Sequence, residues 1–348
     1  MSHWVIQDTS NMTDAAYQAY SLQGVSRTFA LTIPQLPEKL RLQVGNAYLL
    51  CRICDTIEDE SSLHIGQKEK FADNFINVVE GNAPADNFAR TLSEILTDNT
   101  PEAERDLIRN AERVIRLTHG FTPPQRRAIG DCIGEMVSGM LHYQKQQNLD
   151  GLRDVAELNN YCYHVAGVVG VMLTELFCDY SQEIAKNRER MRELAVSFGQ
   201  GLQMTNILKD IWEDRQRGAC WLPRDIFSQC DFELQALPDH RNDDCYLSGI
   251  ERLIAITLSH LRNALKYTLL IPPEEKGIRR FCFWSLGMAL LTLRKINGHR
   301  DFQSGREVKI SHLSVKTTIV ATELVLGNNK RAHWLFDRVA KSLPRHFP

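Results

Sequence analysis

The sequence predicts an all-α protein organised as one domain over residues 1–348. Apolar residues recur at helical spacing, for example at Ile254, Leu258, Leu261 and Leu265. Short alternating runs flanked by Asn-Gly turns, which are typical of β-hairpins, are scarce. No Gly/Ser-rich linker or low-complexity tract divides the chain. Together these observations favour roughly a dozen helices around a common core.

The expected elements follow one another between turn-forming stretches. The first long helix is predicted around residues 42–57, where Leu42, Leu49, Ile53 and Ile57 share a face. Further apolar helical stretches lie at residues 165–176, 254–265, 281–293 and 317–326. Gly, Pro, Asn and Asp interrupt the pattern, and breaks are therefore expected at residues 81–87, 97–101, 121–124, 236–239 and 271–274.

Charge and cysteine content exclude several classes of protein. The 41 basic and 43 acidic residues nearly cancel, so no basic excess indicates nucleic-acid binding. Cys51 and Cys54 form a C-x-x-C without a second pair, and we interpret them as buried apolar side chains rather than zinc ligands. The nine cysteines show no disulfide-like spacing, which predicts a reducing compartment.

The sequence also bears on localisation. The N-terminus lacks the apolar core of a signal peptide. No run of about 18 consecutive apolar residues occurs, so no transmembrane segment and no C-terminal membrane anchor are expected. We therefore expect a cytoplasmic protein whose membrane contact, if it has any, is peripheral.

Two acidic motifs of the form D-x-x-E-D lie far apart in the sequence. The first is D-T-I-E-D at residues 55–59, and the second is D-I-W-E-D at residues 210–214. On a helix, residues four apart share a face, so Asp55 lies with Asp59, and Asn206, Asp210 and Asp214 form one stripe. Gln203 lies close to that stripe. Carboxylates grouped in this way repel one another unless a cation lies among them.

Oxygen ligands of this kind favour Mg²⁺ or Mn²⁺ over zinc. The candidate metal ligands are Asp55, Glu58, Asp59, Asn206, Asp210 and Asp214. A single such motif is typical of a solvated helix face, but both copies here are embedded in apolar sequence. We therefore expect the two motifs to face each other and to hold several Mg²⁺ ions around a diphosphate, with Arg52 and Lys209 as phosphate partners. A di-iron site is excluded because no glutamate has a histidine three residues later.

Five ordered motifs then resemble one family over nearly the whole chain. They are S-R-T-F-A at residues 26–30, Y-L-L-C-R-I-C-D-T-I-E-D at 48–59, Y-C-Y-H-V-A-G-V-V-G at 161–170, Q-M-T-N-I-L-K-D-I-W-E-D-R-Q-R-G at 203–218, and W-L-P at 221–223. In these the chain resembles the squalene/phytoene synthase family, the head-to-head prenyl transferases. The resemblance implies the class I isoprenoid (terpenoid) synthase fold, an all-α bundle with a central cavity.

Within the family, the squalene synthase branch of bacterial type is the most similar. D-T-I-E-D, Phe281-Cys282 and V-K-I at residues 308–310 resemble that branch. Three features depart from it. Y-C-Y-H is partly similar to the phytoene branch, Ser311 stands where eukaryotic members have a basic residue, and F-W-S-L replaces a Pro-Gln-containing stretch.

The resemblance implies a reaction and its site residues. Two farnesyl diphosphates would condense with Mg²⁺ (or Mn²⁺) to presqualene diphosphate, which NADPH would then reduce to squalene. The implied catalytic residues are Tyr161, Arg52, Asp55, Asp59, Asp210 and Asp214. The implied substrate contacts are Ser26, Arg27, Phe29, Tyr48, Arg52, Gln203, Asn206, Lys209 and Phe281. The implied NADPH contacts are Arg27, Arg52, Lys209 and Lys309, outside any Rossmann fingerprint.

Several alternatives stay open at this stage. The product could be dehydrosqualene or phytoene, formed without NADPH, or the chain could be a non-catalytic scaffold relative. Taken alone, Ser26 reads as a helix cap, Lys309 as a surface lysine, and the aromatic residues as core packing. The sequence does not specify an oligomeric state.

Overall fold

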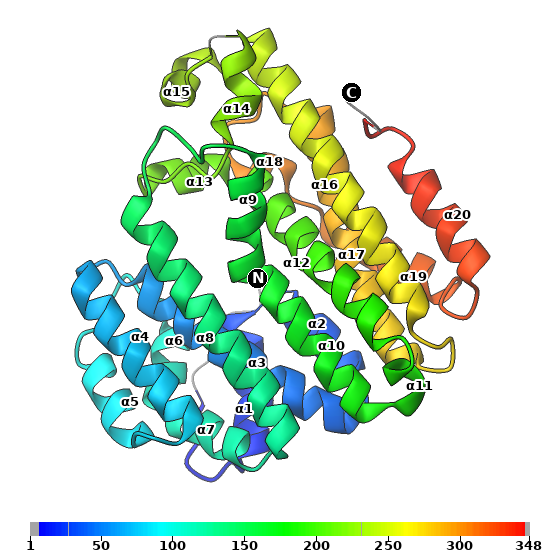
Figure 1. Ribbon diagram of the computed structural model, residues 1–348. Helices are drawn as coiled ribbons and strands as arrows, with labels where there is room; N and C mark the ends of the chain where they lie inside the picture. The colour runs from blue at the N-terminus through cyan, green and yellow to red at the C-terminus, as the bar shows by residue number, and fades with distance from the viewer. Residues whose placement is uncertain (1–6, 27, 231, 345–348) are drawn as a thin grey trace. The chain divides into compact units, whose positions relative to one another are not determined.

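The regular structure of the protein is helical, which confirms the all-α prediction (Figure 1). The computed structural model describes residues 7–26, 28–230 and 232–344, where the one β interaction is an isolated parallel bridge between Leu152 and Pro223. The chain divides into two compact units. The first comprises residues 1–145 and 172–186, and the second comprises 146–171 and 187–348. That the whole chain acts as a single domain stays a prediction.

The first unit is a set of packed helices. They are α1 (Asp14–Val25), α2 (Phe29–Thr32), a 3₁₀ turn (Ile33–Gln35), α3 (Glu38–Asp59), α4 (Ile65–Glu80), α5 (Ala85–Ser93), α6 (Glu102–Arg109), α7 (Ala111–His119), most of α8 (Pro123–Gln146), the end of α10 (Val168–Tyr180) and α11 (Gln182–Ala185). The break predicted at residues 97–101 is confirmed, and those at 81–87 and 121–124 are confirmed in part, because α5 begins at Ala85 and α8 at Pro123. Gly81 ends α4 at φ 88°, a conformation that side chains other than glycine rarely adopt.

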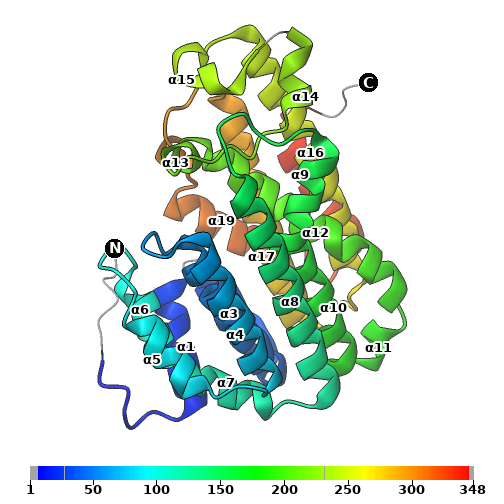
Figure 2. The ribbon, with the colours of Figure 1, turned by 60° about the vertical axis from the view of Figure 1, so that its left-hand side comes forward.

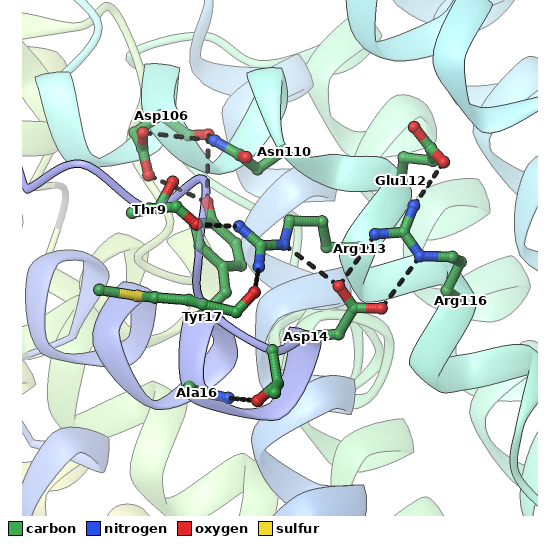
Figure 3. A network of polar contacts seen from close by, with 11 residues as sticks. Thr9, Asp14, Ala16, Tyr17, Asp106, Asn110, Glu112, Arg113 and Arg116 are labelled. Atoms are coloured by element: carbon green, nitrogen blue, oxygen red, sulfur yellow. Dashed lines mark hydrogen bonds and ion pairs between the residues drawn. The ribbon is translucent and has the colours of Figure 1, made fainter.

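A polar network fixes α1 to its neighbours in the first unit (Figure 3). Asp14 accepts hydrogen bonds from Nε of Arg113 at 3.2 Å and from Nε of Arg116 at 2.9 Å, both on α7. These contacts, chiefly that of Arg116, lower the pKa of Asp14. The Tyr17 hydroxyl donates to Asp106 Oδ2 at 3.0 Å, and the Arg113 guanidinium lies 4.7 Å from the Tyr17 ring centre. Helix α3, which carries the first acidic motif, packs against this frame (Figure 2).

The second unit is built around three long helices. Its elements are α9 (Val155–Cys162), a π-helical turn η2 (Tyr163–Gly167), the start of α10, α12 (Arg188–Lys209), α13 (Ile211–Gln216), α14 (Arg224–Phe227), 3₁₀ turns (Ser228–Cys230, Leu234–Ala236), α15 (Leu237–His240), α16 (Asp244–Leu270), α17 (Lys276–Gly298), α18 (Gly305–Val308), α19 (His312–Glu323) and α20 (Asn329–Ala340). Helix α12 packs on η2, α16 and α17 (Figure 1).

Two details of the second unit differ from the sequence prediction. The break at residues 271–274 is confirmed, but residues 237–240 form a short helix because Pro238 lies in its first turn, where proline is tolerated. The helix expected through the second acidic motif ends at Lys209 and restarts at Ile211. The described residues therefore form more helical segments than the roughly dozen expected from periodicity.

A continuous helical stretch, Val155–Tyr180, is long and apolar enough to span a membrane, with a mean hydropathy of 1.4. Half of its most apolar window is buried within the protein. It also carries polar side chains with protein partners. Asp179 accepts a hydrogen bond from Gln125 at 2.6 Å, and Asn159 Oδ1 lies 3.1 Å from His260 Nε2. We interpret the stretch as a core helix, longer than the sequence pattern indicated.

One disulfide corrects the expectation from cysteine spacing. Cys230 and Cys245 are joined, with their Cα atoms 6.0 Å apart, while the seven other cysteines, including Cys51 and Cys54, are buried and form no disulfide. The spacing of the cysteines does not indicate this pairing, because packing of distant segments brings the two cysteines together. The ring centres of Phe227 and Tyr246 lie 6.0 Å apart, which brings the turn before Cys230 to the start of α16.

A buried polar chain links α9, α12 and α16. Asn263 Nδ2 donates to the Ser197 hydroxyl at 3.0 Å, and Ser197 Oγ lies 2.8 Å from Nδ1 of His260. His260 Nε2 lies 3.1 Å from Asn159 Oδ1. An amide oxygen can only accept, so Nε2 carries the proton, Nδ1 accepts from Ser197, and the ring is neutral. Burial accordingly lowers the pKa of His260 to about 4.

We expect this histidine to make the stability of the fold depend on pH. Its pKa is about 4 in the folded protein and about 6.5 in the unfolded chain. Its contribution is therefore complete above pH ~6.5 and is lost as the pH falls towards 4, a change of about 3 kcal/mol. Urea unfolding of the native protein and of His260→Gln at pH 7 and pH 4 measures it. Equal losses of stability in both proteins would contradict the prediction.

Candidate active site

The first acidic motif lies on the last turns of α3. Asp55 is 29% exposed at its side chain, while Asp59 is exposed. Burial, together with Asp59 and Glu104, raises the pKa of Asp55 to about 6 against the opposing effect of Arg52. An ionised Asp55 is thus unfavourable unless a further cation approaches it.

The end of α3 is held by partners that the sequence did not indicate. The carbonyl oxygen of Glu58 accepts hydrogen bonds from Lys68 Nζ and from Gln144 Nε2, the latter at 2.9 Å. Glu60, the last acid of the cluster, is 2% exposed. Burial would raise its pKa, but hydrogen bonds from Ser62, Thr97 and Thr100 outweigh burial and lower it to about 2. Glu60 therefore has a structural role at the C-terminal end of α3, and the candidate metal ligands of this motif are the acids that precede it.

Arg52 lies at the centre of the first cluster. Its Nη1 is 3.3 Å from Asp55 Oδ2 and 3.9 Å from Glu104 Oε1, and its Nη2 donates to the Tyr48 hydroxyl at 3.2 Å. Burial alone would lower the pKa of Arg52, but Asp55, Tyr48 and Glu104 raise it. Its Nε is buried and makes no hydrogen bond to the described residues. A fixed, permanently charged guanidinium with a spare donor suits an anionic oxygen.

Glu104, on α6, is a site residue that sequence reasoning missed. It lies outside every motif, yet its Oε2 is 3.3 Å from the Thr56 hydroxyl and its other oxygen faces Arg52. Burial raises its pKa despite Arg52 and Thr56. No pattern in the sequence could identify it, because only the packing of α6 on α3 brings it there.

The N-terminal candidates lie beside Tyr48. The ring centres of Phe29 and Tyr48 are 5.1 Å apart, and the Tyr48 hydroxyl donates to the Val25 carbonyl at 3.3 Å. The Ser26 hydroxyl accepts the Phe29 amide proton at 2.9 Å, as a helix-start residue does. Arg27 lies outside the described residues. Among these candidates, Phe29 thus contacts Tyr48, and Tyr48 in turn contacts Arg52.

The second acidic motif spans a break between α12 and α13. Asp210 is at the break, with φ −102° and ψ 17°. Its N–H donates to the Asn206 carbonyl at 2.8 Å, and the Asp214 N–H donates to the Asp210 carbonyl at 2.9 Å. One-turn spacing is therefore kept despite the break. Asn206 is exposed, while Gln203, Asp210 and Asp214 are partly exposed, so the predicted stripe is accessible.

Lys209 pairs directly with this stripe. Its ammonium lies 3.0 Å from Asp210 Oδ2. Burial raises the pKa of Asp210, and Lys209 offsets part of that effect. Each acidic motif thus has a half-buried aspartate with a raised pKa and one close cation, Arg52 in the first and Lys209 in the second.

Tyr161 lies at the end of α9, where the backbone passes into the π-turn η2. It is 7% exposed, and its ring stacks on that of Trp221 with centres 4.3 Å apart and planes 12° from parallel. The W-L-P motif therefore supplies the partner of the tyrosine. π-Turns are rare and concentrate at functional sites.

Glycines allow η2 to lie directly on α12. A Cβ at Gly199 would come within 2.3 Å of the Ala166 carbonyl oxygen, and one at Gly170 within 2.3 Å of the Ala195 carbonyl oxygen. Neither contact leaves room for a side chain, which explains in physical terms Gly170, the last residue of the motif at 161–170, and Gly199 on α12.

The remaining candidates lie on α17 and after α18. Phe281 is 5% exposed and Trp284 is 7% exposed, so both are buried among the helices of the second unit. Lys309 is exposed, and its carbonyl accepts a hydrogen bond from Lys295 Nζ at 2.7 Å. The side chains of two exposed lysines thus start from neighbouring places on the surface.

Comparison with known proteins gives the family. A family model described as squalene/phytoene synthase matches residues 22–314. The chain belongs to the squalene/phytoene synthase family. It is 30% identical over 300 residues to squalene synthase of Saccharomyces cerevisiae, covering 83% of this chain and 63% of that protein. It is 29% identical over 294 residues to squalene synthase of Schizosaccharomyces pombe, covering 83% of this chain and 61% of that one.

Solved structures show the fold of this family member to be that of the terpenoid synthases. TcSQS bound to a ligand matches with a TM-score of 0.73 and 22% identity, over 96% of this chain and 94% of that chain. Squalene synthase HpnC from Alicyclobacillus acidocaldarius matches at 0.61 and 18%, over 84% and 95%. The chain spans about 60% of the length of the yeast relatives.

The donor set of this family member fits magnesium. In the described parts of the chain, no three His, Cys, Asp or Glu residues form a ready-made metal cluster. Each motif alone presents carboxylate and amide oxygens, which suit a cation that keeps part of its water shell and shares it with a phosphate. The raised pKa of Asp55 and of Asp210 marks the two positions where such a cation would be most stabilising.

Proposed function

We propose that this protein is a squalene synthase, which condenses two farnesyl diphosphates to presqualene diphosphate and then reduces this to squalene with NADPH. The proposal rests chiefly on one observation: the family fold carries two acidic motifs, each with a half-buried aspartate beside a fixed cation. A scaffold relative would have no use for these buried charges, since each opposes the folded state.

In the proposed mechanism, different side chains hold the metal and bind the diphosphate. Bound Mg²⁺ supplies charge neutralisation and Lewis-acid assistance to the departing diphosphate. Asp55, Glu58 and Asp59 would hold it at the first motif, and Asp210, Asp214 and Asn206 at the second. The partly exposed Arg52 guanidinium would bind a diphosphate oxygen, and the Lys209 ammonium another. Gln203, on the same accessible side of α12, would support the water shell or a phosphate.

The apolar groups protect the reacting carbons. Departure of diphosphate would leave an allylic cation. Water would quench this cation if it reached it. Aromatic faces stabilise a cation and exclude water. Tyr161, Trp221 and Phe281, all in the second unit, would serve in this way, with Phe29 and Tyr48 near the diphosphate end. The released diphosphate or the Tyr161 hydroxyl would take the proton lost on cyclopropane closure.

NADPH supplies the hydride of the second half-reaction. Lys309, with Lys295 beside it, offers exposed ammonium groups for its phosphates. The proposed contacts of Arg52 and Lys209 with the nicotinamide cofactor follow from the family resemblance, as does that of Arg27. Ser311 stands where eukaryotic members have a basic residue, and here its hydroxyl caps α19 by accepting the Ser314 amide proton at 3.1 Å.

Product analysis tests the assignment. The protein is incubated with farnesyl diphosphate and Mg²⁺, with and without NADPH, and the products are identified by mass spectrometry. We expect squalene with NADPH and presqualene diphosphate without it. Dehydrosqualene regardless of NADPH would assign the other branch, as would phytoene in a parallel incubation with the C20 prenyl diphosphate. No product from either prenyl diphosphate would support a scaffold. Cytoplasmic location, peripheral membrane contact and the absence of a nucleic-acid partner stay predictions.

A further inference from the structure

Glu213, the fourth residue of the second D-x-x-E-D motif, contacts a distant part of the chain. Its two carboxylate oxygens lie 3.1 and 3.3 Å from the amide nitrogen of Gly305, and one lies 3.5 Å from the Ser304 hydroxyl. Both partners are at the start of α18. The carboxylate thus accepts the first N–H of α18. We call residues Phe302–Lys309 the α18 segment.

The neighbouring Trp212 makes a second tie to the same segment. Its indole Nε1 donates to the Phe302 carbonyl at 2.6 Å. Phe302, at the start of the α18 segment, is 2% exposed, and Val308, the last residue of α18, is 0% exposed. Consecutive residues of α13 therefore hold the α18 segment at its N-terminal side, and burial of Val308 holds its C-terminal side, just before Lys309.

Gly305 brings this segment against Asp210 itself. A Cβ at Gly305 would lie 2.8 Å from the Lys209 carbonyl oxygen, 3.2 Å from Asp210 Oδ1 and 3.3 Å from Glu213 Oε1. A side chain would therefore displace the backbone at Lys209 or the Asp210 carboxylate. Glycine is required here by close approach, although its φ is not in the left-handed region.

We propose that Glu213 is a positioning residue, which joins the α18 segment to Asp210 so that Lys309 and the second acidic motif keep a fixed geometry. The carboxylate is committed to the Gly305 amide, so it differs in role from Asp210 and Asp214. In the squalene synthase reaction, on which this inference rests, the join would fix the NADPH-phosphate contact relative to the diphosphate end. Holding both ligands in fixed relative positions lowers the activation free energy more than binding either ligand alone.

Amide hydrogen exchange tests the join without relying on activity. In the native protein, the peptide covering residues 299–309 should be protected at Gly305. We expect Glu213→Ala to speed exchange there by at least about tenfold, because one hydrogen bond to a carboxylate is lost. Glu213→Gln keeps an acceptor oxygen and should restore most of the protection. Glu189→Gln, an exposed glutamate at the start of α12, is the matched control and should change nothing.

Steady-state kinetics then separates positioning from metal binding. Glu213→Ala should raise the KM for NADPH about tenfold, with kcat at saturating NADPH changed less than threefold and the Mg²⁺ requirement unchanged. Gly305→Ala, whose added Cβ would displace the Lys209 backbone or the Asp210 carboxylate, should raise the KM for NADPH at least as much. Unchanged exchange in Glu213→Ala would overturn the join. A fall in kcat shared by Glu213→Ala and Glu213→Gln, with a higher Mg²⁺ requirement, would overturn it in favour of a metal ligand.

The two proposals can fail separately. If the native protein forms no NADPH-dependent product, the squalene synthase assignment fails, while the exchange experiment still decides whether Glu213 holds the α18 segment. If squalene forms and exchange in Glu213→Ala stays native, only the positioning role fails.

Discussion

Asp55→Asn and Asp210→Asn are each expected to lower the turnover of farnesyl diphosphate by about a thousandfold, which corresponds to about 4 kcal/mol of transition-state stabilisation. Each substitution keeps the side-chain shape and removes the charge. Burial raises the pKa of both aspartates, which means that each ionised carboxylate lacks a sufficient counter-charge in the protein alone. In the proposed mechanism a divalent cation supplies this counter-charge, and an asparagine would no longer attract that cation. Initial rates with farnesyl diphosphate and Mg²⁺ measure the loss.

Folding must be separated from chemistry in this test. Asp73→Asn, an exposed aspartate on α4, is the matched control and should keep turnover within about threefold. Thermal unfolding of metal-free protein should show no lower midpoint for Asp55→Asn than for the native chain, since ionised Asp55 opposes the folded state. Native turnover by either variant would contradict the metal-holding role.

The double variant tests whether the two motifs act on one diphosphate. They lie in different units of the fold, so their joint action is an expectation from the sequence and the family. Groups that act as a unit show strongly non-additive losses, because removing the first already disables the second. We expect the turnover of the double variant Asp55→Asn/Asp210→Asn to be at most about tenfold below that of the slower single variant. Losses that multiply in full would indicate two independent sites.

The sequence predicted the elements that carry the site because those elements follow local rules. Helical periodicity and the turn residues placed α3, α12, α16 and α17 and most of the breaks between them. Spacing by four predicted that Asn206, Asp210 and Asp214 share a side, and the backbone hydrogen bonds keep that spacing across the break at Asp210. Arg52 and Lys209 were identified for the same reason, since each lies within one turn of an aspartate.

Residues that depend on packing between distant segments were not predictable in this way. Glu104 reaches Arg52 only because α6 packs on α3, and Gly305 reaches Asp210 only because Glu213 and Trp212 hold the α18 segment. The Cys230–Cys245 disulfide arises similarly. The break at Asp210 was missed because the apolar pattern of residues 203–214 continues through it. In each case the sequence gives residue types, and long-range contacts decide their neighbours.

Gly199→Ala is expected to lower the free energy of unfolding by about 3 kcal/mol or more, the largest stability effect among the substitutions considered. The added Cβ would lie 2.3 Å from the carbonyl oxygen and 2.5 Å from the carbonyl carbon of Ala166, and 2.7 Å from the Gly167 nitrogen. All three are backbone atoms of η2, so no side-chain rotation can relieve the clash. Either α12 moves away from η2 or the π-turn changes, and Tyr161 lies two residues before that turn. Urea unfolding measures the loss, and turnover should fall with it.

In ordinary helical positions the same change has the opposite sign: a Cβ at Gly130 or Gly134 on α8 meets no atom within 4 Å. Gly130→Ala and Gly134→Ala should therefore stabilise the protein by about 0.5–1 kcal/mol through helix propensity. A Gly199→Ala protein that unfolds like these controls would show that η2 does not need its close contact with α12.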